Sequence, residues 1–320
     1  MSVVPSWKPS VVETRGDCIE SVHCGGAIAI DSSGRVLYEL GQTGEEKTFF
    51  RSAVKIWQAA PLMECGARSK YGFTDAEIAL TVSSHNGERR HTELAKQMLD
   101  KVGLPVSALM CGAHQPYAGV LPNGESPSAL HNNCSGKHAG MLATCAFHQW
   151  PLESYQHHDH PLQVEIRSSI RKAAGMAEDE ELPFGVDGCG VPTYFMSLRS
   201  MATVFSGVTR DHGETRRCIA ENSWCIAGEN EFDTILPEVT NGRIIAKRGG
   251  AALQCINVGD IGIAIKVGDG NMSCKEIMAM RVLEKLNLLT PEESAKLSSF
   301  SKRPLTNVSG MVIGSLEAIF

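Results

Sequence analysis

Apolar and polar positions form short strand-like runs near both ends of the chain. Residues 27–31 and 35–40 flank a turn that contains glycine, so they predict a β-hairpin. Residues 252–258 and 261–267 repeat the pattern around a Gly-Asp turn, and a last strand is expected near residues 310–313. The sequence therefore predicts an antiparallel sheet to which both termini contribute.

The middle of the chain has the spacing of helices instead. Between residues 161 and 174, Leu162, Ile166 and Ile170 recur every four residues, which predicts an amphipathic helix. Thr74 precedes an apolar run with early acidic residues and is a predicted helix cap. Further helices are expected at residues 93–102, 139–147, much of 198–227, and 275–288.

These elements predict an α/β protein of the α+β type. Neither repeats nor a linker divide the chain, so we expect a single domain over residues 1–320. A helical lobe, roughly residues 60–240, is inserted between the strands from the two termini.

Two polar stretches lie within the predicted lobe. Residues 111–130 are rich in Pro, Gly and Asn, which predicts a long irregular loop over a binding site. Residues 155–161 contain three histidines, and a solvated helix start or a metal site would explain them. No nearby residue completes a metal-ligand set, which favours the helix start.

Composition and charge narrow the class of protein. Of the 320 residues, 42% are hydrophobic and 21% charged, which is typical of a soluble globular protein. The 30 basic and 36 acidic residues give a charge of −6, so neither nucleic acid nor a membrane surface is an expected partner. The absence of a long apolar run, and of a signal peptide at the start, predicts a cytoplasmic location. The odd number of cysteines, 11, predicts free thiols.

A serine and a lysine three residues apart, Ser52 and Lys55, open a predicted helix. This spacing places a hydroxyl and an amine on one helical face. A desolvated, neutral lysine can take the hydroxyl proton while the serine attacks a carbonyl carbon. Chance matches to so short a motif are common, so its meaning depends on the rest of the chain.

Two more motifs follow in order. Ser84 and Asn86 lie in a polar loop, and Lys266 and Gly268 end a predicted strand. The succession Ser-x-x-Lys, Ser-x-Asn, Lys-x-Gly resembles the signature of the serine β-lactamase and penicillin-binding superfamily, which includes serine-dependent glutaminases. Chemically, the set offers a nucleophile, two lysines to move protons and a second hydroxyl to relay them.

Four strings make the resemblance more specific. Residues 51–55, 83–88, 131–138 and 187–192 together resemble the rhizobial-type, or class 3, L-asparaginases, and the likeness runs over nearly the whole chain. The resemblance implies a serine β-lactamase-like fold, a homodimer, and hydrolysis of L-asparagine to L-aspartate and ammonia.

The resemblance also implies roles for single residues. It makes Ser52 the nucleophile with Lys55 beside it, and Ser84 with Lys266 a second Ser-Lys pair. Ser52 would attack the amide carbon while Lys55 takes its proton, and the second pair would carry a proton to the departing ammonia. Water would then hydrolyse the aspartyl ester.

A zinc ion is implied in the same way, with Cys134, Lys137 and Cys189 as ligands. Thiolates suit zinc, whereas lysine is an unusual ligand that binds only as the neutral amine. Without the resemblance, Cys134 and Cys189 would be interpreted as buried, inert thiols. The zinc would either orient the substrate through bound water or brace the loops.

The charged ends of the substrate need partners, since their desolvation would otherwise cancel binding. The candidates are Arg51, Asn133, His138 and Asp187. Arg51 is equally suited to a structural ion pair. Asp187 belongs to an Asp-Gly turn dipeptide, and its place two residues before Cys189 favours a role in the site.

Three alternatives compete with an L-asparaginase. A glutaminase or another amidase of the same fold differs by one methylene of substrate, a discrimination of about 1 to 3 kcal/mol that sequence does not reveal. A β-lactamase does not account for the zinc-site motifs. A non-catalytic zinc or thiol sensor would have lost its Ser-Lys pairs, and both pairs are present.

Overall fold

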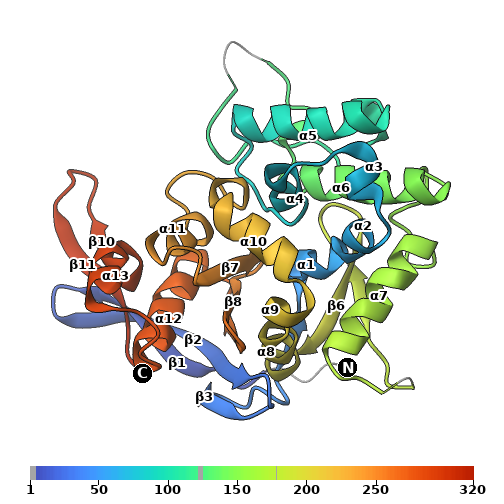
Figure 1. Cartoon of the computed structure of the whole chain (residues 1–320). Helices are drawn as coiled ribbons and strands as arrows, with labels where there is room; N and C mark the ends of the chain where they lie inside the picture. The colour runs from blue at the N-terminus through green and yellow to red at the C-terminus, as the bar shows by residue number, and fades with distance from the viewer. Residues whose placement is uncertain (1–4, 122–124, 178) are drawn as a thin grey trace. The chain divides into compact units, whose positions relative to one another are not determined.

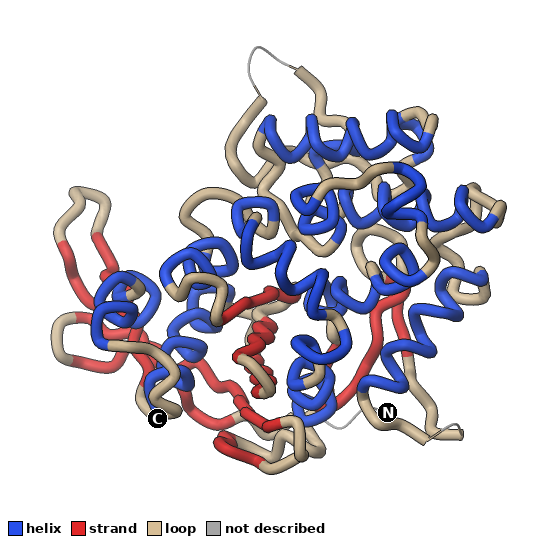
Figure 2. Tube along the Cα trace, in the orientation of Figure 1, coloured by secondary structure: helices blue, strands red, loops and turns tan. Residues whose placement is uncertain are grey.

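The structure is a computed structural model that describes residues 5–121, 125–177 and 179–320. It contains two compact units. We call Met1–Ala53, Phe195–Asp211 and Ile235–Phe320 the sheet unit, and Val54–Tyr194 with His212–Thr234 the helical unit. In Figure 2 most of the red strands belong to the sheet unit and helices dominate the helical unit.

The sheet unit is built around an eight-stranded antiparallel sheet. Its strand order is β10-β11-β1-β2-β9-β8-β7, with β3 also paired to β2, so strands from the two ends of the chain are neighbours. The bounds are β1 Lys8–Arg15, β2 Cys18–Asp31, β3 Val36–Leu40, β7 Ile244–Gly249, β8 Leu253–Val258, β9 Ile261–Val267, β10 Lys302–Thr306 and β11 Val312–Ala318.

Helices α8 (Leu198–Ser206) and α12 (Met272–Lys285) pack on opposite faces of this sheet (Figure 1). A Cβ atom at Gly262 would lie 2.0 Å from the carbonyl oxygen of Ala202 in α8. On the other face, a Cβ atom at Gly25 would meet the sulfur of Met278 in α12 at 2.9 Å. Glycine therefore permits the close approach of α8 to β9. The unit also contains α9 (Val208–Asp211), α13 (Pro291–Lys296) and α14 (Ser298–Ser301).

A second, three-stranded sheet has the order β4-β6-β5. β6 (Pro192–Ser197) runs from the helical unit into the sheet unit. Its first half pairs with β5 (Phe184–Val186) in the helical unit, and its second half pairs with β4 (Lys47–Phe49) in the sheet unit. Helix α11 (Phe232–Val239) also passes from one unit to the other.

The helical unit is centred on α6 (Ser135–His148), which is buried over its first eleven residues. A Cβ atom at Gly136 would lie 2.5 Å from the backbone oxygen of Leu80, so α4 (Asp75–Thr81) approaches α6 more closely than any side chain would allow. The other helices are η1 Arg51–Val54 at the boundary, α1 Lys55–Gln58, α2 Ala60–Glu64, α3 Ala67–Tyr71, α4 Asp75–Thr81, α5 Arg89–Val102, η2 Val106–Ala108, η4 Ala129–His131, α7 Pro161–Ala173, α10 Gly213–Glu221 and η5 Ser223–Cys225.

The structure confirms the predicted mixed fold, with an antiparallel sheet formed by both ends of the chain and helices between them. Thr74 caps α4 through a capping box with Glu77, and both predicted hairpins are present. The last strand lies at Val312–Ala318 rather than near residues 310–313. Helix α12 begins three residues before the predicted start because the Asn271 side chain accepts hydrogen bonds from the first-turn amides. The single domain over residues 1–320 stays a prediction.

The predicted loop 111–130 is irregular up to Ser128 in its described parts, and residues 122–124 lie outside the described residues. Its end forms the short helix η4, capped by Ser128. All eleven cysteines are free thiols, as expected. Among the described residues, every helix is too short or too polar to span a bilayer.

Candidate active site

Ser52 and Lys55 lie on one continuous helical segment, in which η1 (Arg51–Val54) leads into α1 (Lys55–Gln58). Arg51, directly before Ser52, has a φ of 47°, in the left-handed region that non-glycine residues seldom occupy. Ser52 is half-buried, whereas Lys55 is 1% exposed. The segment therefore carries a partly accessible hydroxyl and, one turn later, a buried amine.

The Lys55 amine is held by three oxygens of the helical unit. Its Nζ lies within hydrogen-bond distance of the backbone oxygen of Ser83, of Ser84 Oγ at 3.1 Å and of the backbone oxygen of Asn133 at 3.4 Å. Burial lowers the pKa of Lys55, and the Cys134 sulfur opposes part of this shift. The amine thus gives up its proton more readily than an exposed lysine does.

The loop that carries Ser84 is fixed on both sides. The Ser84 amide donates to Ile226 O at 2.7 Å, and the Asn86 amide donates to Ala227 O at 2.8 Å. His85 Nδ1 accepts from the Gly87 amide at 3.1 Å, so its Nε2 carries the proton and donates to Ser135 Oγ at 2.9 Å. These bonds hold the Ser84 hydroxyl against Lys55.

Cys134, Lys137 and Cys189 lie together in the helical unit, and each is at most 5% exposed. Lys137 Nζ donates to Cys189 Sγ at 2.9 Å. A hydrogen bond from Cys189, together with the nearby amines of Lys55 and Lys137, lowers the pKa of Cys134, and the same bond raises the pKa of Cys189. Burial lowers the pKa of Lys137, but the two sulfurs outweigh burial and raise it. One thiolate is therefore favoured beside a protonated amine.

This donor set has the chemistry of a zinc site. Two sulfurs and one amine converge in a buried space, and three protein ligands leave a coordination position open, as in catalytic zinc sites. In the part of the chain that the structure describes, no three His, Cys, Asp or Glu side chains lie together as metal ligands. A metal held here would therefore take Lys137 as its third ligand beside the two thiols.

The two ring nitrogens of His138 differ in their hydrogen bonding among the residues that the structure describes. Its Nδ1 lies 2.6 Å from the hydroxyl of Tyr155, and both residues are 0% exposed. Its Nε2 is buried and has no hydrogen-bond partner among the described residues. Burial lowers the pKa of His138, as do the charges of Lys137 and Lys55, so the ring is neutral.

Two other predicted substrate residues belong to the same unit. Asp187 begins the turn that presents Cys189: its Oδ1 accepts from the Gly188 amide at 2.8 Å and its backbone oxygen accepts from Gly190. Asn133 offers its backbone oxygen to Lys55 and its amide to His114 Nε2, at 3.2 Å. Both residues therefore shape the backbone around the thiols.

Lys266 lies at the end of β9 in the sheet unit. Its Nζ donates to the backbone oxygens of Ala251, at 2.7 Å, and of Val267. Burial lowers the pKa of Lys266 to about 8, although the carboxylate of Asp269 acts in the opposite direction. Asp269 is itself bonded to His23 Nδ1 at 2.5 Å. Lys266 is therefore a lysine that changes charge near neutral pH.

Arg51 lies against the turn that holds Lys266. A Cβ atom at Gly250 would be 2.9 Å from the Arg51 guanidinium carbon, so glycine leaves room for this side chain. Ala251, the next residue, accepts the hydrogen bond from Lys266. Within the sheet unit, one turn thus touches the residue before Ser52 and also holds Lys266.

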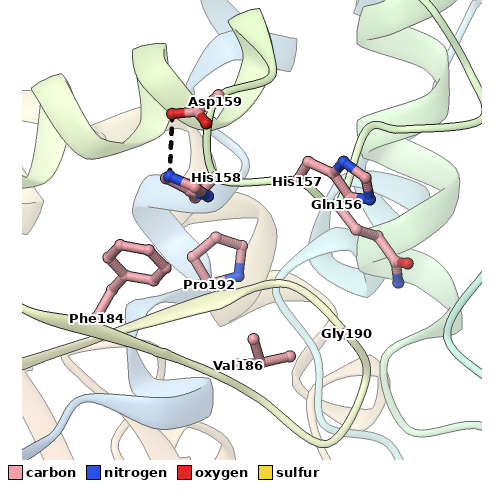
Figure 3. Close-up of a pocket in the computed structure, with 8 residues that line it drawn as sticks. All are labelled: Gln156, His157, His158, Asp159, Phe184, Val186, Gly190 and Pro192. Atoms are coloured by element: carbon pink, nitrogen blue, oxygen red, sulfur yellow. Dashed lines mark ion pairs between the residues drawn. The ribbon is translucent and has the colours of Figure 1, made fainter.

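A surface pocket of the helical unit is shown in Figure 3. His158 stacks on Phe184 at 4.7 Å and pairs with Asp159 at 3.0 Å. His160 caps α7 by accepting from the Leu162 amide, so the run ends at a helix start as predicted, but His160 is buried rather than solvated. None of the predicted site residues lines this pocket.

The structure distributes the predicted site residues over both units. The sheet unit holds Arg51, Ser52 and Lys266, and the helical unit holds Lys55, Ser84, Asn133, Cys134, Lys137, His138, Asp187 and Cys189. Sequence analysis missed Tyr155 and Ala251, which hold His138 and Lys266. Tyr155 belongs to no sequence motif. Ala251 binds Lys266 through its backbone oxygen, which every residue type has, so the sequence carries no signal for it.

Comparisons with known proteins identify a family for the chain. The sequence matches the family described as L-asparaginase II over residues 11–318. A comparison with curated proteins gave no match.

Solved structures of Mglu are similar at low identity. They include its L-glutamate binding form in 4.3 M NaCl (12% identity, TM-score 0.38, 82% of this chain and 59% of that chain). Its glutamate form has 13% identity and a TM-score of 0.36, and the match covers 82% of this chain and 61% of that chain. Its native form has 12% identity and a TM-score of 0.34, with 82% of this chain and 64% of that chain covered. The chain spans less than two thirds of these structures, and at such scores the likeness identifies no substrate.

Proposed function

Because the chain belongs to the L-asparaginase II family, we propose that it is an amidohydrolase that converts L-asparagine to L-aspartate and ammonia. The observation that supports this most is the buried Lys55 amine, one helical turn after Ser52 and 3.1 Å from the Ser84 hydroxyl. A lysine whose pKa is lowered by burial is suited to accept a serine proton.

In the proposed reaction, Ser52 Oγ attacks the side-chain amide carbon of asparagine. Its proton passes to Lys55, and the amide oxygen gains the negative charge of a tetrahedral intermediate. The carbon–nitrogen bond then breaks, and the leaving nitrogen takes a proton supplied by Lys266 through Ser84. Water then attacks the ester carbonyl carbon and gives one proton through Ser84 to Lys266. The ester carbon–oxygen bond breaks, Lys55 returns its proton to Ser52 Oγ, and aspartate is released.

Zinc belongs to this proposal as a resident cofactor. Cys134, Lys137 and Cys189 would hold it, with both sulfurs as thiolates and the lysine as the neutral amine. When bound, zinc supplies Lewis-acid and charge-stabilising chemistry. The three side chains also tie the turn at Cys189 to the start of α6, which orders the backbone at Asn133 and His138.

The buried Nε2 of His138 supports a role in substrate binding. A donor that is buried and unpaired costs about 1 to 3 kcal/mol, and a ligand oxygen would relieve that cost. The α-carboxylate of asparagine is an acceptor of this kind. Arg51, Asn133 and Asp187 remain the other candidates for binding the charged ends of the substrate.

The finer points of the proposal are the substrate, the assembly and the location. Glutamine is the alternative substrate, because it differs from asparagine by one methylene. We also propose a homodimer, and a cytoplasmic enzyme that acts on a free small molecule.

The experiment is to measure ammonia release from L-asparagine and L-glutamine by the wild type and by Ser52→Ala, with zinc content determined on the same preparations. We expect asparagine to be preferred, and Ser52→Ala to lose nearly all activity while it keeps its zinc. Ser32→Ala, at an exposed serine of the sheet unit, is the matched control. A Ser52→Ala enzyme with most of its activity would end the nucleophile assignment, and a preference for glutamine would replace the substrate.

A further inference from the structure

The Tyr155 hydroxyl takes part in two hydrogen bonds in the interior of the helical unit. The Met110 backbone amide donates to it at 3.0 Å, and His138 Nδ1 lies 2.6 Å away. The rings of Tyr155 and His138 meet edge to face, with centroids 5.4 Å apart. Because both side chains are 0% exposed, water does not compete for these bonds.

The direction of these two hydrogen bonds follows from the Met110 amide, which can only donate. The Tyr155 oxygen therefore accepts from Met110. Among the residues that the structure describes, the acceptor recorded for the tyrosine proton is His138 Nδ1. If Nδ1 were protonated instead, both its N–H and the Met110 N–H would point at the oxygen, and the tyrosine proton would be buried without a partner. The hydrogen-bond geometry therefore requires an unprotonated Nδ1, which leaves the ring proton on Nε2.

Glutamine side chains hold the backbone at Tyr155 and at Met110 by hydrogen bonds. Gln163 Nε2 donates to the Tyr155 carbonyl at 2.8 Å. Gln156 Nε2 donates to Met110 O at 3.0 Å and to Cys189 O at 2.7 Å. Figure 3 labels Gln156 and Gly190, where a Cβ atom would lie 2.5 Å from that amide nitrogen. The Met110 amide is thus held in place to orient the hydroxyl.

We propose that Tyr155 is a positioning residue that fixes His138 as the Nε2–H tautomer, so that Nε2–H donates a hydrogen bond to the substrate carboxylate. The substrate part of this inference rests on the proposed function, whereas the tautomer is a property of the free enzyme. Tyr155 does not touch the substrate, and it acts only through the His138 ring.

The first test uses the wild-type protein without substrate. Nitrogen-15 correlation spectra of the histidine rings distinguish the two neutral tautomers, and the His138 signals are identified by their loss in His138→Gln. We expect a pyrrole-type Nε2 and a pyridine-type Nδ1. A pyrrole-type Nδ1 overturns the proposal, with no dependence on a variant or on activity.

The second test compares Tyr155→Phe with Tyr194→Phe. Tyr194 is also buried in the helical unit, so its replacement removes one hydroxyl from a similar interior. We expect Tyr155→Phe to populate the Nδ1–H tautomer and to raise KM for asparagine about tenfold, with little change in kcat, because a bond to the bound substrate is weakened. Tyr194→Phe should change neither quantity.

The outcomes separate this inference from the proposed function. An unchanged tautomer in folded Tyr155→Phe, or a loss of kcat with an unchanged KM, overturns the positioning role. If wild type hydrolyses neither asparagine nor glutamine, the proposed function fails while the spectra still decide the tautomer. Should Tyr155→Phe fail to fold, the wild-type spectra alone decide it.

Discussion

The pH dependence of the proposed reaction is a direct consequence of where Lys266 lies. Burial brings the pKa of its amine to about 8. Two of its N–H bonds are taken by the backbone oxygens of Ala251 and Val267. A protonated amine has a third N–H, which is the proton available for the leaving ammonia. The proposed donor therefore works only below its pKa.

The magnitude follows from that value. With a pKa of about 8, roughly 90% of the amine is protonated at pH 7 and roughly 10% at pH 9. We expect kcat/KM for asparagine to fall about tenfold between these pH values. Lys55 has the opposite requirement, because it must be neutral to accept the serine proton. Activity is therefore also expected to fall at acid pH, where Lys55 becomes protonated. The two lysines together predict a bell-shaped profile.

The assay is aspartate formation across pH 6 to 10, which avoids the titration of free ammonia. The amino group of the substrate also titrates near pH 8, so the decline is compared in wild type and Lys266→Met. In Lys266→Met the residual activity should lack the part of the decline that Lys266 causes. Asp269→Asn removes the charge that raises the pKa of Lys266, so the decline should move to lower pH. Asp260→Asn, an exposed carboxylate of the same unit, is the control.

A kcat/KM that rises between pH 7 and 9 in wild type, with the rise lost in Lys266→Met, would refute the donor role and make Lys266 a base. A decline identical in wild type, Lys266→Met and Asp269→Asn would assign it to the substrate instead.

Three further predictions concern packing, metal and backbone. Gly136→Ala should destabilise the protein by about 1 to 3 kcal/mol, because the new Cβ would overlap a backbone carbonyl of α4; Gly213→Ala, with open space at its Cβ, should not lower the melting temperature. Cys134→Ser should abolish stoichiometric zinc measured by mass spectrometry, whereas Cys225→Ser, at a buried thiol elsewhere, should retain it. Ala252→Gly, at a φ of 57°, should raise the free energy of unfolding by about 1 kcal/mol in denaturant titrations. A stable Gly136→Ala, full zinc in Cys134→Ser, or a destabilised Ala252→Gly would contradict these interpretations in turn.

Alternating strands and capped helices could be predicted from sequence because their signals are local. Thr74 and Glu77 form a reciprocal cap within four residues, and the β8–β9 hairpin pairs neighbours in the chain. β1 and β10 were missed for physical reasons. β1 has few apolar positions, and β10 contains Pro304, which suits an edge strand but weakens a strand signal.

The candidate site shows the same division between local and distant information. Ser52 and Lys55 are one turn apart, so their relation is readable from spacing. Lys137 and Cys189 lie 52 residues apart and touch at 2.9 Å, and only resemblance to a family brought them together in advance. The 3.1 Å bond from Lys55 to Ser84 was likewise not derivable from spacing, since it depends on how the loop after α4 is held by Ile226.

Three strained residues of the sheet unit lie beside the proposed reactive groups. Arg51, Ala251 and Ala252 all have φ between 47° and 57°, and such conformations cost of order 1 to 3 kcal/mol each. Arg51 precedes the proposed nucleophile, and the Ala251 carbonyl holds the Lys266 amine. The strain persists because the contacts around it leave no alternative: the Ala252 carbonyl accepts from Val267 at 3.1 Å, and Gly250 admits the Arg51 side chain. A relaxed turn would move the carbonyl away from Lys266, so we interpret the strain as the cost of fixing this amine in place.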